Sequence, residues 1–297
     1  MEILSAEIKS NISHTFTFSD KVDKFIIGFS KILIEYPSTD HHLKRILYDV
    51  SNIQVNDREI VVTPRLRLND ASGNSESFDS IITVVIFATL GYKNTSVDML
   101  TNVKTNVERI LPLCNPVFYK SALSSSGVEY PDDDHHLNKY NSKIEFCLLD
   151  GSFTLKGQST IQDRHEVSGT GEVYGSSIIY NGNDHRIMCA DFDSEKVGNS
   201  GTVSFGKKHK KIHLQDYQLG CFISSFSLSF KSYEDHHVKQ IEVSAELEEQ
   251  NLIDQDGQLL AKINLKAFLT DNGKHHSDIP NNSVSGFILA INKRMTQ

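Results

Sequence analysis

The sequence contains no tryptophan, few prolines and only four cysteines. Sugar-binding sites often use flat aromatic side chains, and tryptophan is the largest of these, so its absence weakens a carbohydrate-binding role. The cysteines show no CxxC spacing and no close pairing. This pattern favours free thiols in a reducing compartment over a disulfide framework.

Basic residues are also in short supply. The chain has 30 Lys and Arg against 38 Asp and Glu, a formal net charge of −8. Phosphate binding normally needs a basic surface, so nucleic acid is disfavoured as the main partner. The one basic cluster, KKHKKIH at residues 207–213, is typical of a solvated turn, and a contact with an anion or an acidic partner is the alternative.

Targeting segments and enzyme signatures are missing as well. No run approaches the ~20 apolar residues that cross a bilayer. The opening MEILSAEIKS carries acidic residues and no continuous apolar stretch, so it does not resemble a cleaved signal peptide. We therefore expect a cytoplasmic protein, or one released without a cleaved signal. The sequence has no GxSxG, P-loop, GxGxxG or HExxH motif and indicates no reaction class.

What the sequence does contain is one tripeptide, Asp-His-His, three times. An apolar residue follows each copy, and the copies are Asp40, His41 and His42; Asp134, His135 and His136; and Asp235, His236 and His237. Tyrosines precede them at Tyr36, Tyr130 and Tyr233, and turns led by Asp70, Asp163 and Asp271 follow. Self-similarity of this kind indicates an internal repeat.

Strand-like segments surround each tripeptide. Segments rich in Phe, Ile and Leu with imperfect apolar–polar alternation lie before and after it, as in half-buried strands. The pattern predicts an all-β, sandwich-like fold of three divergent copies of a four-stranded antiparallel meander. The predicted units are residues 1–94, 95–185 and 186–297, the second opening with a helix and the third with an insert.

The predicted helix covers residues 95–111. Apolar side chains recur there at helical spacing, at Val97, Leu100, Val103, Val107 and Ile110. Thr95 or Ser96 can cap the start and Pro112 stops the helix.

The Asp-His-His turns are expected to be structural ties. Neighbouring residues on a strand point to opposite faces, so two adjacent histidines do not chelate one ion easily. His42 and His237 share the phase of the apolar positions that follow them. We expect these two side chains to lean toward the core and the first histidine of each pair to face away. The aspartate is expected to accept backbone N–H bonds in a tight turn.

A metal site is the alternative, with zinc or another divalent cation as cofactor. Zinc favours imidazole nitrogen and carboxylate oxygen. One histidine per copy can assemble a site around a pseudo-threefold axis. A local site can also form in the third copy, which holds the densest set of potential ligands: Asp235, His236, His237, His275, His276 and Asp278.

Repeated β units offer several strand edges and equivalent surfaces, which suit oligomerisation or multivalent attachment. The sequence therefore favours a non-catalytic binding or assembly protein, oligomeric or particle-associated, that engages a protein partner or itself. The alternatives are a lectin-like glycan-binding protein and a metal-dependent enzyme that uses the Asp-His-His turns. In architecture alone, the three-copy plan resembles the β-rich subunits of lectin-like proteins and of phage-derived particles.

Overall fold

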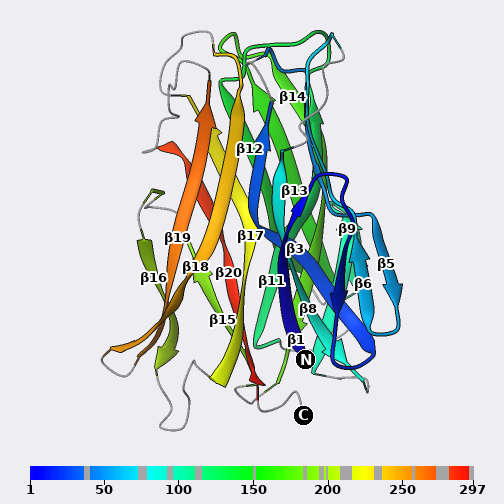
Figure 1. Cartoon of the computed structure of the whole chain (residues 1–297), viewed down its shortest axis with the longest axis vertical. Coiled ribbons are helices and arrows are strands. Elements are labelled where there is room, and N and C mark those ends of the chain that lie inside the picture. The colour runs from blue at the N-terminus through cyan, green and yellow to red at the C-terminus, as the bar shows by residue number, and fades with distance from the viewer. Residues whose placement is uncertain are drawn as a thin grey trace.

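The computed structural model describes most of the chain: residues 1–36, 41–72, 79–91, 96–110, 116–149, 152–182, 186–193, 197–198, 200–207, 216–230, 236–255, 258–271 and 281–293. Figure 1 shows an elongated molecule whose strands run roughly along its long axis. The N-terminus and the end of the last strand lie at the same end of the molecule (Figure 1).

The described residues form strands almost throughout. The first segment holds β1 (Glu2–Lys9), β2 (His14–Thr17), β3 (Val22–Glu35), β4 (Arg45–Asp49), β5 (Ile53–Asn56), β6 (Glu59–Val62), β7 (Arg65–Asn69) and β8 (Ile81–Leu90). The second holds β9 (Val97–Lys104), β10 (Glu108–Ile110), β11 (Phe118–Glu129), β12 (Lys139–Leu149), β13 (Ser152–Gln162) and β14 (Ser168–Tyr180). The third holds β15 (Ile187–Phe192), β16 (Ser200–Lys207), β17 (Tyr217–Ser229), β18 (Gln240–Gln255), β19 (Gln258–Thr270) and β20 (Ser283–Asn292).

Alternating side chains explain why these residues form strands. In β19 every second side chain is buried, as at Ala261, Ile263 and Leu265, and the residues between them, Lys262 and Asn264 included, stay partly exposed. A period of two places one face of a strand on the core and the other in water. The all-β prediction is therefore confirmed.

The strands of the three segments pair in the same way. An opening strand (β1, β9 or β15) lies beside the closing strand of its own segment (β8, β14 or β20). The closing strand pairs on its other side with a long strand, β3, β11 or β17. Each long strand has a register shift at a serine, and these are Ser30, Ser124 and Ser224. A shift of this kind is a β-bulge, which bends the strand.

Neighbouring segments are joined by backbone pairing in a closed cycle. β4 of the first segment pairs with β11, β12 of the second pairs with β17, and β18 of the third pairs with β3. Four-stranded units, β8-β3-β18-β19, β14-β11-β4-β7 and β20-β17-β12-β13, result from this exchange. Contacts between β13 and β14 merge two of them, so the described sheets have six, eleven and three strands, the smallest being β2-β6-β5.

This cycle corrects the predicted meander. Among the described residues, β3 pairs with β8 and β18 rather than with β4, the next long strand along the chain. The edge of β3 that a hairpin with β4 would need is occupied by β18 of the third segment, so β3 and β4 do not form a hairpin. The division into units at 1–94, 95–185 and 186–297 stays a prediction.

The predicted helix at 95–111 is wrong. Residues Val97–Lys104 form β9 on the edge of β14, with Val97 opposite Tyr180. Val97 and Met99 are the buried residues of this strand, and their spacing of two is that of a strand rather than a helix. Asn102 adopts a positive φ of 46°, which a helix does not accommodate. Pairing with a strand edge outweighs the local helical spacing here.

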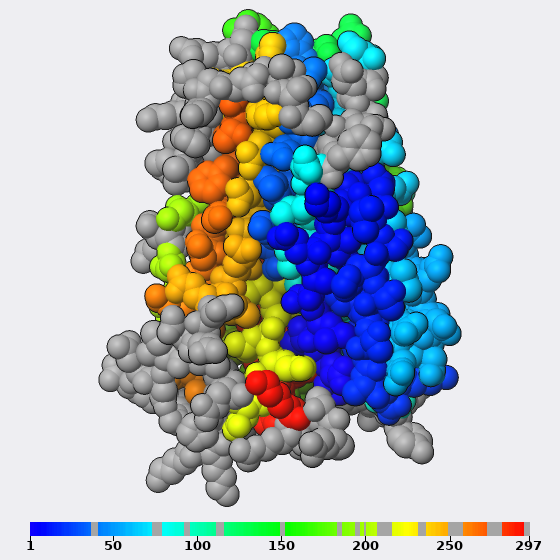
Figure 2. Space-filling model, viewed as in Figure 1, coloured from blue at the N-terminus to red at the C-terminus, as the bar shows by residue number. Residues whose placement is uncertain are grey.

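The inward faces of the sheets share one large apolar core. Side chains from all three segments belong to it, for example Ile34, Val128 and Leu228 from the long strands. Figure 2 shows the third segment packed directly against the first on one face of the molecule. In the part of the chain that the structure describes, no helix has the length and apolarity needed to cross a membrane.

Candidate functional site where the three segments meet

The histidine pairs lie in three equivalent connections, between β3 and β4, β11 and β12, and β17 and β18. These connections bond to one another. His41 and Val238 exchange two backbone hydrogen bonds of 3.2 and 3.0 Å, and Leu43 and His135 exchange two of 2.8 Å. Residues remote in sequence are thereby held at one end of the molecule, the end toward which β19 points in Figure 1.

Three more backbone bonds complete a cycle at this end. In each, an amide at the end of a long strand donates to a carbonyl of another connection: Tyr36 to Lys239 (3.0 Å), Tyr130 to Lys44 (3.0 Å) and Phe230 to Asn138 (3.1 Å). The third segment therefore has Phe230 where the others have tyrosine. The predicted counterpart, Tyr233, lies outside the described residues.

The first histidine of each pair forms an ion pair or hydrogen bond with the aspartate that directly follows β7, β13 or β19 of its own segment. The distances from Nδ1 to Oδ2 are 3.3 Å for His41–Asp70, 2.9 Å for His135–Asp163 and 3.0 Å for His236–Asp271. An aromatic ring packs on each of these imidazoles, with centroids 4.3–4.6 Å apart, from Tyr36, Tyr130 and Phe230. These contacts tie each connection to its own sheet.

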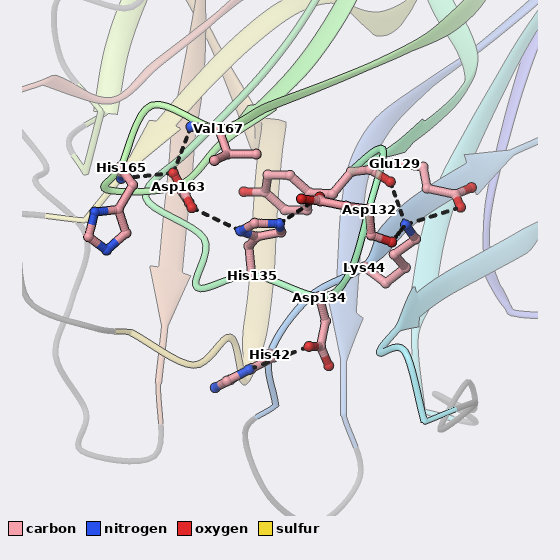
Figure 3. A network of polar contacts seen from close by, with 10 residues as sticks. His42, Lys44, Glu129, Asp132, Asp134, His135, Asp163, His165 and Val167 are labelled. Carbon is pink, nitrogen blue, oxygen red and sulfur yellow. Dashed lines mark hydrogen bonds and ion pairs between the residues drawn. The ribbon is translucent and has the colours of Figure 1, made fainter.

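His135 has a second carboxylate partner. Its Nε2 lies 2.9 Å from Asp132, while its Nδ1 faces Asp163, as Figure 3 shows. Burial lowers the pKa of His135, but the hydrogen bonds to the two carboxylates outweigh it, so the pKa is raised. Asp163 is held in turn by the backbone N–H groups of His165 and Val167, each at 2.8 Å (Figure 3).

The second histidines of the three pairs converge. His42, His136 and His237 each offer a ring nitrogen, and the three nitrogens lie within 4.8 Å of one another. Nε2 of His42 is 2.5 Å from Nε2 of His136. Ring centroids are 4.1, 4.5 and 4.8 Å apart, and the rings are steeply inclined to one another. Nitrogen atoms that converge in this way form a candidate metal-ligating set.

The three-histidine cluster adjoins core residues along the chain. Leu43, Leu137 and Val238 directly follow the three histidines and are almost fully buried. On its outer side the cluster is partly open, because the His42 side chain is 41% exposed. Nδ1 of His42 lies 3.6 Å from Asp134 (Figure 3). Asp134 also accepts a hydrogen bond from the Ala71 N–H.

The two members of each pair are oriented differently from the sequence-based expectation. His236, expected to face away from the core, is only 6% exposed in its side chain and holds Asp271. His42, expected to lean inward, is 41% exposed in its side chain. The reason is that β4 begins only at Arg45, so strand parity does not extend back to the histidines.

Of the predicted local ligand set, the structure uses His237 in the cluster and His236 in the tie to Asp271. His275, His276 and Asp278 lie outside the described residues, as do Asp40 and Asp235. The pairing of the first histidines with Asp70, Asp163 and Asp271 was not predicted from the sequence. The signal was present, because each turn aspartate recurs after its own Asp-His-His copy.

A second feature lies far from the histidines. Ile110, in the edge strand β10, is 86% exposed, and Val107, Tyr119 and Leu148 are exposed large apolar side chains as well. We call these four residues the apolar strip. Because β11 runs from Tyr119 toward Tyr130, the strip lies ~35 Å from the histidine end, at ~3.3 Å per residue.

Contacts across neighbouring strands join Tyr119 and Leu148 of the strip. Leu148 lies opposite Phe153, and Phe153 lies opposite Arg109 beside Ile110. The Phe153 ring stacks on Phe146 at 4.7 Å, and Phe146 stacks on Tyr119 at 4.6 Å. Tyr119 and Leu148 thus lie along one aromatic seam. Ile110 lies opposite Ser152, so its side chain points to the other face of the sheet.

Comparison with protein-family models, curated proteins and solved structures finds no match for this chain.

Proposed function

We propose that the protein is a non-catalytic, β-rich binding or assembly protein that engages a protein partner through the apolar strip. The observation that carries this proposal is the exposure of four large apolar side chains in one segment: Tyr119 and Leu148 on the aromatic seam, and Val107 and Ile110 in or beside the edge strand β10. Contiguous exposed apolar surface on a soluble protein often marks a protein-binding site, whereas single exposed apolar residues need no explanation.

The strand β10 adds to this support. It has three residues and pairs with β13, the one partner it has among the described residues. An edge strand leaves backbone donors and acceptors available to another chain. Apolar side chains beside such an edge supply the contact area, and an aromatic residue such as Tyr119 is typical of interface centres.

Self-association of the chain is the first form of assembly to test. Sedimentation velocity of the full chain over roughly 1–100 µM covers interfaces of ordinary strength. We expect a concentration-dependent dimer or larger species. Ile110→Asp should weaken it at least ~10-fold, because a carboxylate would have to be desolvated in the interface.

Val55→Asp is the matched control. Val55 is also an exposed apolar residue, but it lies in β5 of the first segment, away from the strip. An effect confined to Ile110→Asp supports the strip as the interface. A chain that stays monomeric throughout, or one that both variants affect equally, contradicts assembly through this surface.

The glycan-binding alternative has less support. Among the described residues Tyr119 is the one exposed large aromatic side chain, and its ring is stacked on Phe146. A sugar platform needs an open aromatic face.

A further inference from the structure

We propose that His42, His136 and His237 bind one divalent transition-metal ion at the point where the three segments meet. This inference is independent of the apolar strip and of any protein partner. It rests on the convergence of three imidazole nitrogens from three separate parts of the chain. His42 and His136, for instance, are 94 residues apart in sequence.

The spacing of the nitrogens fits a shared ion. Zinc–nitrogen bonds of ~2.0–2.1 Å in a tetrahedral site place two ligand nitrogens ~3.3 Å apart. The observed spacings are compatible with this value: 2.5 Å between His42 and His136, and all three nitrogens within 4.8 Å of one another. Side-chain rotations that move each nitrogen by less than ~1 Å therefore complete the set. The backbone has no need to move.

Electrostatics favours a cation at this place. Imidazole nitrogens that converge point lone pairs at one another unless a proton or a metal ion lies between them. Nε2 of His42 and Nε2 of His136 lie at hydrogen-bond distance, so a proton can bridge this pair when no ion is bound. A bound ion would replace that bridge with coordinate bonds from all three imidazoles.

The surroundings of the cluster also suit a metal ion. The residues that follow the three histidines, Leu43, Leu137 and Val238, are buried in the core, and the partial exposure of His42 leaves a path for the ion from solvent. Asp134 stands behind the Nδ1 of His42, on the side away from the other histidines. A carboxylate there orients a ligating imidazole and fixes its tautomer.

The ligand chemistry narrows the class of ion. Imidazole nitrogen suits zinc, copper, nickel and cobalt, whereas magnesium and calcium require oxygen ligands. Three protein ligands leave at least one coordination position for water or an external group. The ion would also cross-link three chain segments, and binding only to the folded chain would raise its stability.

The test uses the full chain purified without a histidine tag and stripped with chelator. Titration with ZnCl₂ by calorimetry should give one site per chain, and CoCl₂ should produce visible absorption bands of a low-symmetry cobalt site. His136→Gln should weaken zinc binding at least ~100-fold, since the loss of an outer partner alone costs ~10- to 100-fold. His42→Gln should do the same, and its open position makes it the safer variant for folding.

Two controls separate this site from its rivals. His14→Gln removes a histidine of β2 that packs edge-on against Phe16 and is not part of the cluster, and it should leave the affinity unchanged. His275→Gln/His276→Gln removes the histidine pair of the local ligand set that the sequence suggested. The proposal is overturned if the chain binds no zinc. It is also overturned if zinc binding survives in His136→Gln and in His42→Gln, even where another variant such as His275→Gln/His276→Gln abolishes it.

Discussion

Nδ1 of His236 lies 3.0 Å from Oδ2 of Asp271, and both side chains are more than nine-tenths buried, at 6% and 9% exposed. The imidazole stacks on Phe230 at 4.3 Å. Through this pair the β17–β18 connection is fastened to the end of β19. A buried polar pair of this kind is costly to break, because the remaining partner loses its hydrogen bond without gaining water.

We therefore expect His236→Gln to lower the free energy of unfolding by ~1–3 kcal/mol. Glutamine is polar and of similar length, so the effect reports the lost bond to Asp271 rather than a large cavity. Urea unfolding followed by far-ultraviolet circular dichroism measures it, with metal chelated throughout. A double-mutant cycle with Asp271→Asn should show coupling between the two positions.

His237→Ala is the informative comparison, since the sequence alone placed the buried tie at this residue. The structure places His237 in the open cluster instead, so without metal its replacement should cost less than that of His236. Equal losses at the two positions, or no loss at His236, would contradict the assignment of the buried tie.

Local pattern was enough to predict the strands and to single out the Asp-His-His copies. Alternation in β19 and the apolar density of β3 are properties of short stretches, and they lead to the correct class. The possibility that one histidine per copy meets at an axis also followed from the repeat. The repeat does not indicate which histidine of each pair binds the turn aspartate and which joins the three-histidine cluster.

The remainder depends on contacts between distant residues. Whether β3 pairs with β4 or with β18 is decided by which strand edges lie side by side in the folded protein. The residues of β3 alone do not contain that information. The helical spacing at Val97–Lys104 is overridden for the same reason, by the free edge of β14. The orientation of His41 and His42 depends on where β4 begins, and strand ends are the least certain part of any pattern.

A second prediction concerns pH and Asp49. Its Oδ1 accepts a 2.7 Å bond from the Ser51 N–H and its Oδ2 a 3.1 Å bond from Arg65 Nε. Burial raises the pKa of Asp49, but the bonds from Ser51 and Arg65 outweigh it and hold the pKa below its usual value. The charged form is therefore favoured by folding.

The sign of the pH dependence follows. A lowered folded-state pKa contributes stability that is present above the unfolded pKa, about 4, and is lost as pH falls through the lower folded value. Asp49→Asn should cost ~1–3 kcal/mol at pH 7, and its difference from wild type should shrink below pH ~4. Urea titrations at pH 7, 5 and 3 measure this.

Glu172→Gln serves as the control for Asp49. Glu172 forms an ion pair with Lys104, but both side chains are open to solvent. Exposed pairs add little to stability, so its unfolding midpoint should match that of wild type at every pH. If Asp49→Asn behaves like Glu172→Gln, or keeps its full effect at pH 3, then the Asp49 carboxylate does not stabilise the fold.

The last prediction tests the close approach of β11 and β14. On its other edge, β11 pairs with β4 of the first segment. A Cβ on Gly171 would lie 2.0 Å from the Gly127 carbonyl oxygen and 2.7 Å from Val128 Cα, both backbone atoms that cannot rotate away. Gly171→Ala should therefore force the two strands apart and cost ~1–3 kcal/mol, as overpacking does.

Gly201→Ala provides the matched comparison, because its added Cβ would meet only Ile263 Cγ2 at 3.8 Å. That variant should stay within ~0.5 kcal/mol of wild type or gain slightly from the stiffer unfolded chain. Amide hydrogen exchange adds a local readout, since Gly171→Ala should speed exchange in β11 and β4 together. Faster exchange in β11 alone would mean that the pairing between segments does not depend on the β11–β14 contact, and equal stability of the two variants would refute the close approach itself.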